Sequence, residues 1–172
     1  MNAALLIDRL ERFASVLAPL VRDLPESDAK FKPPTGAWSI LEIVCHLADE
    51  EVEDFRARLK LTLESPETPW PKIDPEGAAR DRRYNEQDLT QALDRFTRER
   101  HASIAWLRSL GTPDWNLAYT HPKFGPQTAG MLLASWAAHD ALHLRQIAKR
   151  FYELAARDGA PHTTGYAGEW GA

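Results

Sequence analysis

The 172-residue sequence contains one cysteine, Cys45, so it can form neither an internal disulfide nor a cysteine-rich zinc site. Any metal site must therefore be built from histidine, aspartate and glutamate. No stretch approaches the roughly 18 consecutive apolar residues of a membrane span. The first ten residues include Asp8 and Arg9 and lack a signal-type apolar stretch. These absences predict a cytoplasmic protein with no membrane partner.

The sequence also lacks a run of lysine and arginine, and its formal net charge is −4. Nucleic acid is therefore not an expected partner. Hydrophobic residues make up 44% and charged residues 27%, which is ordinary for a globular protein. A chain of this length fits one domain, which can bury about two-thirds of its unfolded surface.

Apolar residues recur with helical spacing in four long stretches, separated by proline-rich breaks. Pro19 should kink the first helix or end it early. Ser39 and Glu42 fit a capping box at the start of the second, and Asn85 is a plausible N-cap for the third. No segment is predicted as a strand, so the fold class is all-α, a four-helix bundle. The predicted helices cover about residues 3–24, 39–64, 85–111 and 126–156.

Two segments fall outside these helices. Residues 65–84 contain four prolines and are long for a connection, so they are expected to form a crossover loop at the end of the bundle. Residues 157–172 are rich in glycine and small residues and should be an irregular tail, docked by Tyr166 and Trp170. The predicted organisation is therefore a bundle over residues 1–156 followed by this tail.

His139 and His143 lie four residues apart in the last predicted helix, so they share one face, one turn apart. That face carries Trp136 and Ile147 and should point inward. His46 lies on the second helix where its apolar face meets an acidic one. Inward-facing histidines without a metal would each need a hydrogen-bond partner. The pattern predicts a metal site of His46, His139 and His143; the alternative is ordinary core or edge histidines.

Three imidazoles with an open position are typical of catalytic rather than closed structural sites. A metal ion at such a position lowers the pKa of a bound water to about 7. Asp49, Glu50 and Glu51 follow His46 closely, and one of them would be a general base, a fourth ligand or an acceptor for a histidine N–H. Asp49 and Glu50 are the predicted catalytic residues. The alternative for this acidic run is a solvated helix face.

Two segments carry a family resemblance: WSILEIVCHLAD at residues 38–49, followed by Glu51, and HDALHLRQI at residues 139–147. HPKFGP at residues 121–126 adds to it. Together they resemble the DinB/YfiT-like superfamily of metal-binding bundles. The resemblance implies an up-down-down-up helix course and a divalent ion, zinc or nickel, held by the three histidines. It also implies a homodimer.

Family members of this kind include metal-dependent hydrolases and transferases or isomerases that use low-molecular-weight thiols. Our first hypothesis is therefore a hydrolase in which the ion activates water for attack on a small-molecule substrate. The second is a thiol-dependent S-transferase or isomerase, whose partner is a small thiol. The third is a non-catalytic metal-binding stress protein.

Other side chains are candidates for secondary roles. His121 would either reach the mouth of the site or be a surface loop residue. Arg100 lies on the apolar seam of the third helix, where it would snorkel along the bundle or meet an anionic substrate. Cys45 is expected to be a small buried hydrophobe. Three aromatic residues would line a pocket or, more commonly, belong to the core: Trp38, Tyr84 and Trp136.

Overall fold

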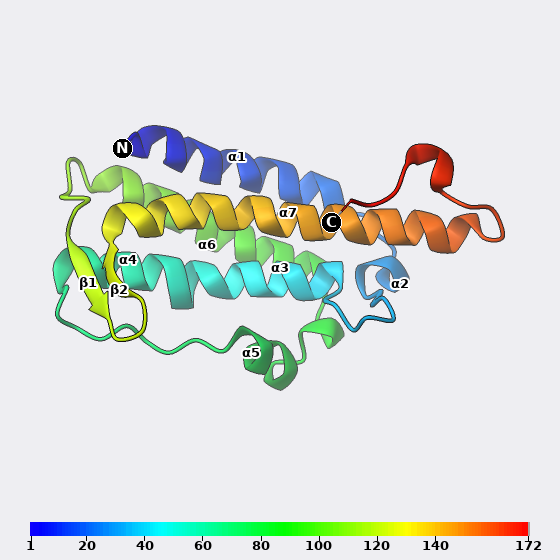
Figure 1. Ribbon diagram of the computed structural model, residues 1–172, viewed down its shortest axis with the longest axis horizontal. Coiled ribbons are helices and arrows are strands. Elements are labelled where there is room, and N and C mark those ends of the chain that lie inside the picture. The colour runs from blue at the N-terminus through cyan, green and yellow to red at the C-terminus, as the bar shows by residue number, and fades with distance from the viewer. Residues whose placement is uncertain (172) are drawn as a thin grey trace.

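The computed structural model describes residues 1–171, and its architecture is a four-helix bundle (Figure 1). The first and last long helices, α1 and α7, run in one direction, and the two long helical segments between them run in the other. This is the predicted up-down-down-up course. The long segments are α1 (Ala3–Val21), the continuous run α3 (Ile40–Asp49), η1 (Glu50–Asp54) and α4 (Phe55–Glu64), then α6 (Leu89–Ser109) and α7 (Ala129–Gly159).

Local sequence signals account for most helix ends. The side chains of Ser39 and Glu42 each accept a hydrogen bond from the other residue's backbone N–H, so the predicted capping box opens α3. Pro19 is followed by only two more residues of α1, which ends early as expected. The prediction that Asn85 caps the third helix was wrong. Asp88 caps α6, whereas Asn85 accepts the Ser39 hydroxyl over 2.6 Å.

The prediction of no strands was also wrong. Residues 118–128 form a small antiparallel hairpin of β1 (Ala118–His121) and β2 (Gly125–Thr128), so α7 begins at Ala129 rather than within the hairpin. Four-residue strands are too short for a clear alternating pattern, and Pro126 disfavours a strand unless it lies at an edge. Gly125 has φ +70°, which suits glycine at the start of the second strand.

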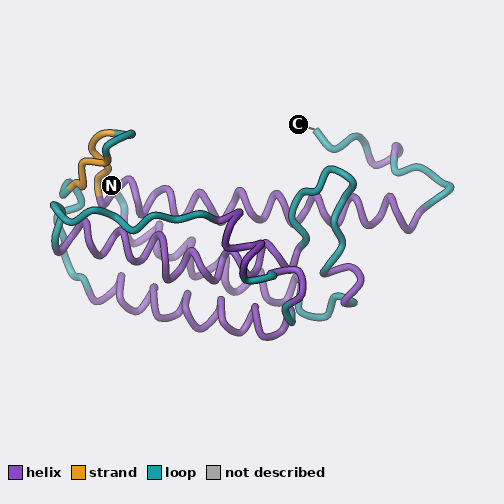
Figure 2. Tube along the Cα trace, turned by 90° about the horizontal axis from the view of Figure 1, so that it is seen from below, coloured by secondary structure: helices purple, strands orange, loops and turns teal. Residues whose placement is uncertain are grey.

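The crossover between α4 and α6 runs back along the bundle, as Figure 2 shows from below. It contains a short helix that the sequence analysis did not predict, α5 (Pro75–Asp81), followed by the single turn η2 (Tyr84–Glu86). Asp74 caps α5 by accepting the Gly77 N–H over 3.0 Å, and Pro75 occupies the first helical turn, where its missing N–H costs nothing. A further short helix, α2 (Glu26–Ala29), follows α1.

The core lies between the four long segments. All ten residues of α3 are buried, which makes it the most enclosed helix of the fold. It packs mainly against α6, and α4 packs against α7. Trp136 of α7 is buried and stacks on Phe55 with their ring centroids 5.5 Å apart. Polar residues on α3 and on the facing side of α7 therefore point into the protein rather than into solvent.

The tail after α7 includes the single turn η3 (Gly165–Ala167). Trp170 contacts Tyr152 of α7 with ring centroids 5.6 Å apart, so this tryptophan docks the tail as predicted. Tyr166 is fully exposed, and its predicted docking role was wrong. Among residues 1–171, no helix combines the length and the hydropathy needed to cross a bilayer.

Candidate metal centre

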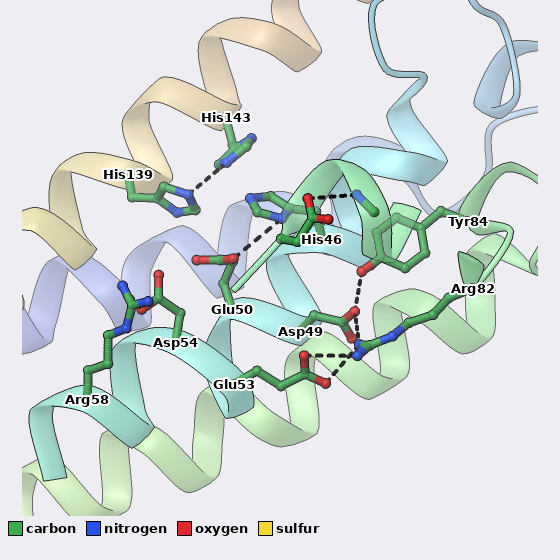
Figure 3. A network of polar contacts seen from close by, with 12 residues as sticks. His46, Asp49, Glu50, Glu53, Asp54, Arg58, Arg82, Tyr84, His139 and His143 are labelled. Carbon is green, nitrogen blue, oxygen red and sulfur yellow. Dashed lines mark hydrogen bonds and ion pairs between the residues drawn. The ribbon is translucent and has the colours of Figure 1, made fainter. Parts of the chain in front are cut away.

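Three imidazoles from two helices meet between α3 and α7 (Figure 3). One ring nitrogen from each of His46, His139 and His143 lies within 4.8 Å of the others. The Nε2 atoms of His139 and His143 are 3.0 Å apart. The His46 ring centroid lies 5.4 Å from that of His139 and 4.8 Å from that of His143. The structure thus brings together all three histidines that the sequence analysis selected.

All three imidazoles are held in their neutral form. Burial, followed by the two neighbouring rings, lowers the pKa of His46 to about 3. Burial, followed by His143 and Arg100, lowers the pKa of His139 to about 3. Burial also lowers the pKa of His143, partly offset by its hydrogen bond to Gln146. Neutral imidazole is the form that binds a metal ion, so the donor set fits a divalent cation.

Gln146 orients His143, one of the three candidate ligands. Its Oε1 lies 2.8 Å from Nδ1 of His143 and accepts the proton there, which leaves the Nε2 lone pair directed toward His139. Such outer contacts fix the tautomer and the ring orientation of metal-binding histidines. Gln146 was not among the residues predicted from the sequence, although its spacing of three residues from His143 places it on the same helix face.

The histidines open into a cavity of about 550 Å³. Trp38 covers His46, with ring centroids 4.9 Å apart, and Phe55 packs on His139 at 5.0 Å. The crossover supplies one wall through Ile73, Pro75 and Glu76. Apolar walls around a few polar groups are typical of small-molecule sites. Trp38 therefore lines the pocket, whereas Trp136 belongs to the core.

Glu50 is the carboxylate nearest to the histidines (Figure 3). Its Oε1 lies 3.6 Å from Nδ1 of His46, and the residue is 7% exposed. Burial, followed by the Asp54 carboxyl, raises the pKa of Glu50 to about 9. Asp54 in turn pairs with Arg58 over 2.8 Å.

Glu50 begins the π-helical turn η1, which interrupts the α-helix formed by α3 and α4. Turns of this kind are rare and occur mostly at functional sites. No residue pattern in the sequence predicted it. The wider turn carries Glu50 and Asp54 on the cavity side and Glu51 on the core side.

Asp49 is directed to a different set of partners. It contacts Arg82 and Arg95 and accepts the hydroxyl of Tyr84. Arg82 also pairs with Glu53 through two contacts of 2.8 and 3.0 Å. Asp49 does not line the metal cavity, but it lines an adjoining hollow that shares His46 and Glu50 with that cavity. Tyr84 belongs to this network and to the core rather than to the metal cavity.

Both expectations for Arg100 were wrong. Its side chain is fully buried and reaches neither solvent nor the cavity. It donates to Glu51 over 2.8 Å and to the two oxygens of Asp140 over 2.6 and 2.8 Å. The indole of Trp136 donates to the same Glu51 oxygen over 3.0 Å. The sequence could not show whether Arg100 snorkels to solvent or pairs with buried carboxylates. Its carboxylate partners lie 49 and 40 residues away along the chain.

His121 and Cys45, two further candidates from the sequence, lie outside the metal cavity. His121 does not line the cavity; its Nδ1 accepts the N–H groups of Lys123 and Phe124 and closes the hairpin turn. Cys45 is buried, as predicted, and burial raises the pKa of its thiol to about 12.

The fold and this centre define the class of the protein: a four-helix bundle with a three-histidine site between two of its helices. The sequence pattern of the DinB superfamily matches residues 9–147, and the chain belongs to that superfamily. It is 25% identical over 149 residues to a protein of Oceanobacillus iheyensis named "Putative metal-dependent hydrolase OB0782", covering 82% of this chain and 81% of that one.

The fold is also similar to that of YfiT from Bacillus subtilis, with a TM-score of 0.78 and 22% identity. The match covers 92% of this chain and 88% of YfiT, which is described as a probable metal-dependent hydrolase with an unusual four-helix bundle topology. These matches agree with the expected family and with its helix course.

Proposed function

We propose that this protein is a metal-dependent hydrolase of small molecules. The proposal is supported chiefly by one observation, the convergence of three neutral imidazoles at a partly enclosed cavity with Glu50 beside them. His46, His139 and His143 hold the ion, which we expect to be zinc or nickel because imidazole suits both. When bound, a divalent ion supplies Lewis acidity and makes water a nucleophile near neutral pH.

The residues of the chain have separate tasks in this proposal. Glu50 accepts the proton of the attacking water and returns it to the leaving group, because its carboxylate adjoins His46 in the cavity. Glu50 would be held in its ionised form by a bound divalent ion, because a nearby opposite charge lowers the pKa of a carboxyl group. Asp49, the other predicted catalytic carboxylate, is assigned to holding Arg82 and Tyr84 in place. Trp38 and Phe55 exclude water around the reacting groups.

The test is hydrolysis of a panel of esters, amides and lactones by protein reconstituted with zinc or nickel in thiol-free buffer. We expect turnover that is lost on chelation and in His143→Ala. Glu50→Gln should retain the metal but lose about 10²- to 10⁴-fold in rate. The matched controls are His101→Ala and Glu67→Gln, which change exposed residues away from the cavity.

Two results would contradict the proposal. Turnover that requires a small thiol would identify the S-transferase or isomerase instead. Stoichiometric metal with no turnover, with or without thiols, would favour the non-catalytic metal-binding protein. The predicted homodimer is a separate question, which light scattering of the metal-loaded protein answers.

A further inference from the structure

A second hollow, of about 590 Å³, adjoins the metal cavity along α7. It shares Ala37, Gln146 and Arg150 with the wall of the metal cavity. Arg145 and Lys149 lie on the α7 side of this hollow, and Trp170 of the docked tail lies on the other. The two hollows together extend the site beyond the histidines toward the C-terminal end of α7.

The charges of the two hollows differ. Carboxylates line the metal cavity, from Glu50, Asp54 and Glu76. The described residues that line the second hollow include three cationic side chains and no carboxylate. Arg145 and Lys149 are exposed, and neither forms an ion pair with any of residues 1–171. A concave surface lined by one sign of charge attracts ligands of the opposite sign.

Arg150 stands at the boundary and is 4% exposed. It pairs with Glu153 over 3.0 Å and donates to the backbone oxygen of Trp38 over 3.4 Å. Its guanidinium is thereby held at the junction of the two hollows. Because a helix rises about 1.5 Å per residue, Lys149 lies about 9 Å along the axis from His143. Trp38 supplies an apolar wall of the metal cavity, and Ala37 is shared by the two hollows.

We propose that the substrate carries an oxyanionic group, a carboxylate or a phosphate, that binds Arg145 and Lys149 beside Arg150 while its reactive group reaches the histidines. The inference rests on the proposed function, because it assigns the far end of the same substrate. A spacer joins the two ends, and its apolar part packs on Trp38, which lines the metal cavity. Arg145 and Lys149 are specificity-determining residues that do not touch the reacting atoms.

Calorimetric titration of the zinc-loaded protein with a matched pair of chelating probes tests this inference. The first probe, suberic acid monohydroxamate, has a metal-binding group at one end and a carboxylate at the other. The second probe is its amide analogue, in which an uncharged carboxamide replaces the carboxylate. We expect the carboxylate probe to bind about tenfold more tightly, because two exposed cations each contribute a modest ion pair. The preference should shrink at high salt, which screens exposed charges. A phosphonate-ended probe tells which of the two anions is preferred.

The double variant Arg145→Gln and Lys149→Gln should bind both probes equally while keeping its zinc. The control Arg9→Gln and Lys60→Gln removes the same charge from exposed positions outside both hollows and should keep the preference. Equal binding of the two probes by the unaltered protein would overturn the inference and leave the proposed function intact. A preference that survives in the first double variant would also overturn it. If neither probe binds to the zinc-loaded protein, the metal site is not open to ligands. That result would contradict both the proposed hydrolase function and the proposed anion-binding residues.

Discussion

Arg100 on α6 donates hydrogen bonds of 2.6 and 2.8 Å to the two carboxylate oxygens of Asp140, the residue that follows His139 on α7. The same guanidinium donates to Glu51 in the π-helical turn and, over 3.0 Å, to the backbone oxygen of Leu10 in α1. One buried cation therefore connects all the long helical segments of the bundle. It joins the residue next to His139 to the turn that carries Glu50, and so fixes α7 against that turn.

Replacing Arg100 with methionine should strongly destabilise the protein. The change leaves two buried carboxylates without their counter-ion, which typically costs about 3–5 kcal/mol. The control is Arg108→Met, which removes exposed pairs with Asp8 and Glu11 and should cost less than about 1 kcal/mol. Urea unfolding measures both free energies. A similar, small loss in the two variants would show that the buried network contributes no more than a surface pair.

Gln146→Leu should weaken metal binding without removing a ligand. The variant lacks the acceptor for the Nδ1 proton of His143, and loss of such a contact typically costs about 10- to 100-fold in affinity. Competition with a chromogenic chelator measures the change. Gln127→Leu, on the hairpin, is the control and should leave the affinity unaltered. Unchanged affinity in Gln146→Leu would exclude an orienting role.

The metal-free protein should lose stability in acid because of its histidines. The pKa of His46 and His139 is about 3 in the folded chain, against an ordinary value near 6.5. At a pH between these two pKa values, the unfolded chain binds more protons than the folded chain does. The stability contributed by the neutral histidines is therefore fully present above about pH 6.5 and falls as the pH drops toward 3. Urea midpoints across this range measure the slope, which His139→Leu should reduce and His101→Leu should not. An unaltered slope in His139→Leu would contradict the assignment.

Cys45 should be inert in the native protein. Its side chain is buried and the pKa of its thiol is raised to about 12, so almost no thiolate exists at pH 8. Mass spectrometry after treatment with iodoacetamide should find no adduct in the folded protein and one adduct in denaturant. Rapid native alkylation would mean that α3 opens or that the thiol is accessible.

Much of the fold was predictable because the signals are local. Helical periodicity gave the four long segments, and the capping box of Ser39 and Glu42 placed the start of α3. The spacing of His139 and His143 placed two candidate ligands on one face. His46 was selected on a different helix because it lies where the apolar face meets an acidic one, and the family resemblance added to that choice.

The features that were missed depend on tertiary structure or on very short segments. The partners of Arg100 lie far away in sequence, so its burial could not be distinguished from a surface role. The π-helical turn consists of four acidic residues and Val52, which would equally suit an ordinary α-helix, so the sequence did not mark it. Asp49 and Glu50 are adjacent acidic residues, so the sequence does not distinguish their roles. Their surroundings differ because the folded chain brings Arg82 and Tyr84 into contact with Asp49.

Because α3–α4 and α6 run in the same direction, the chain must travel the length of the bundle between them, and this return segment carries Ile73, Pro75 and Glu76 to the side of the histidines. One side of the cavity is thus a connection and not a packed helix. Its length and sequence can diverge without repacking the interior, which leaves the ligands untouched. New substrates can therefore arise in this architecture by remodelling a single loop.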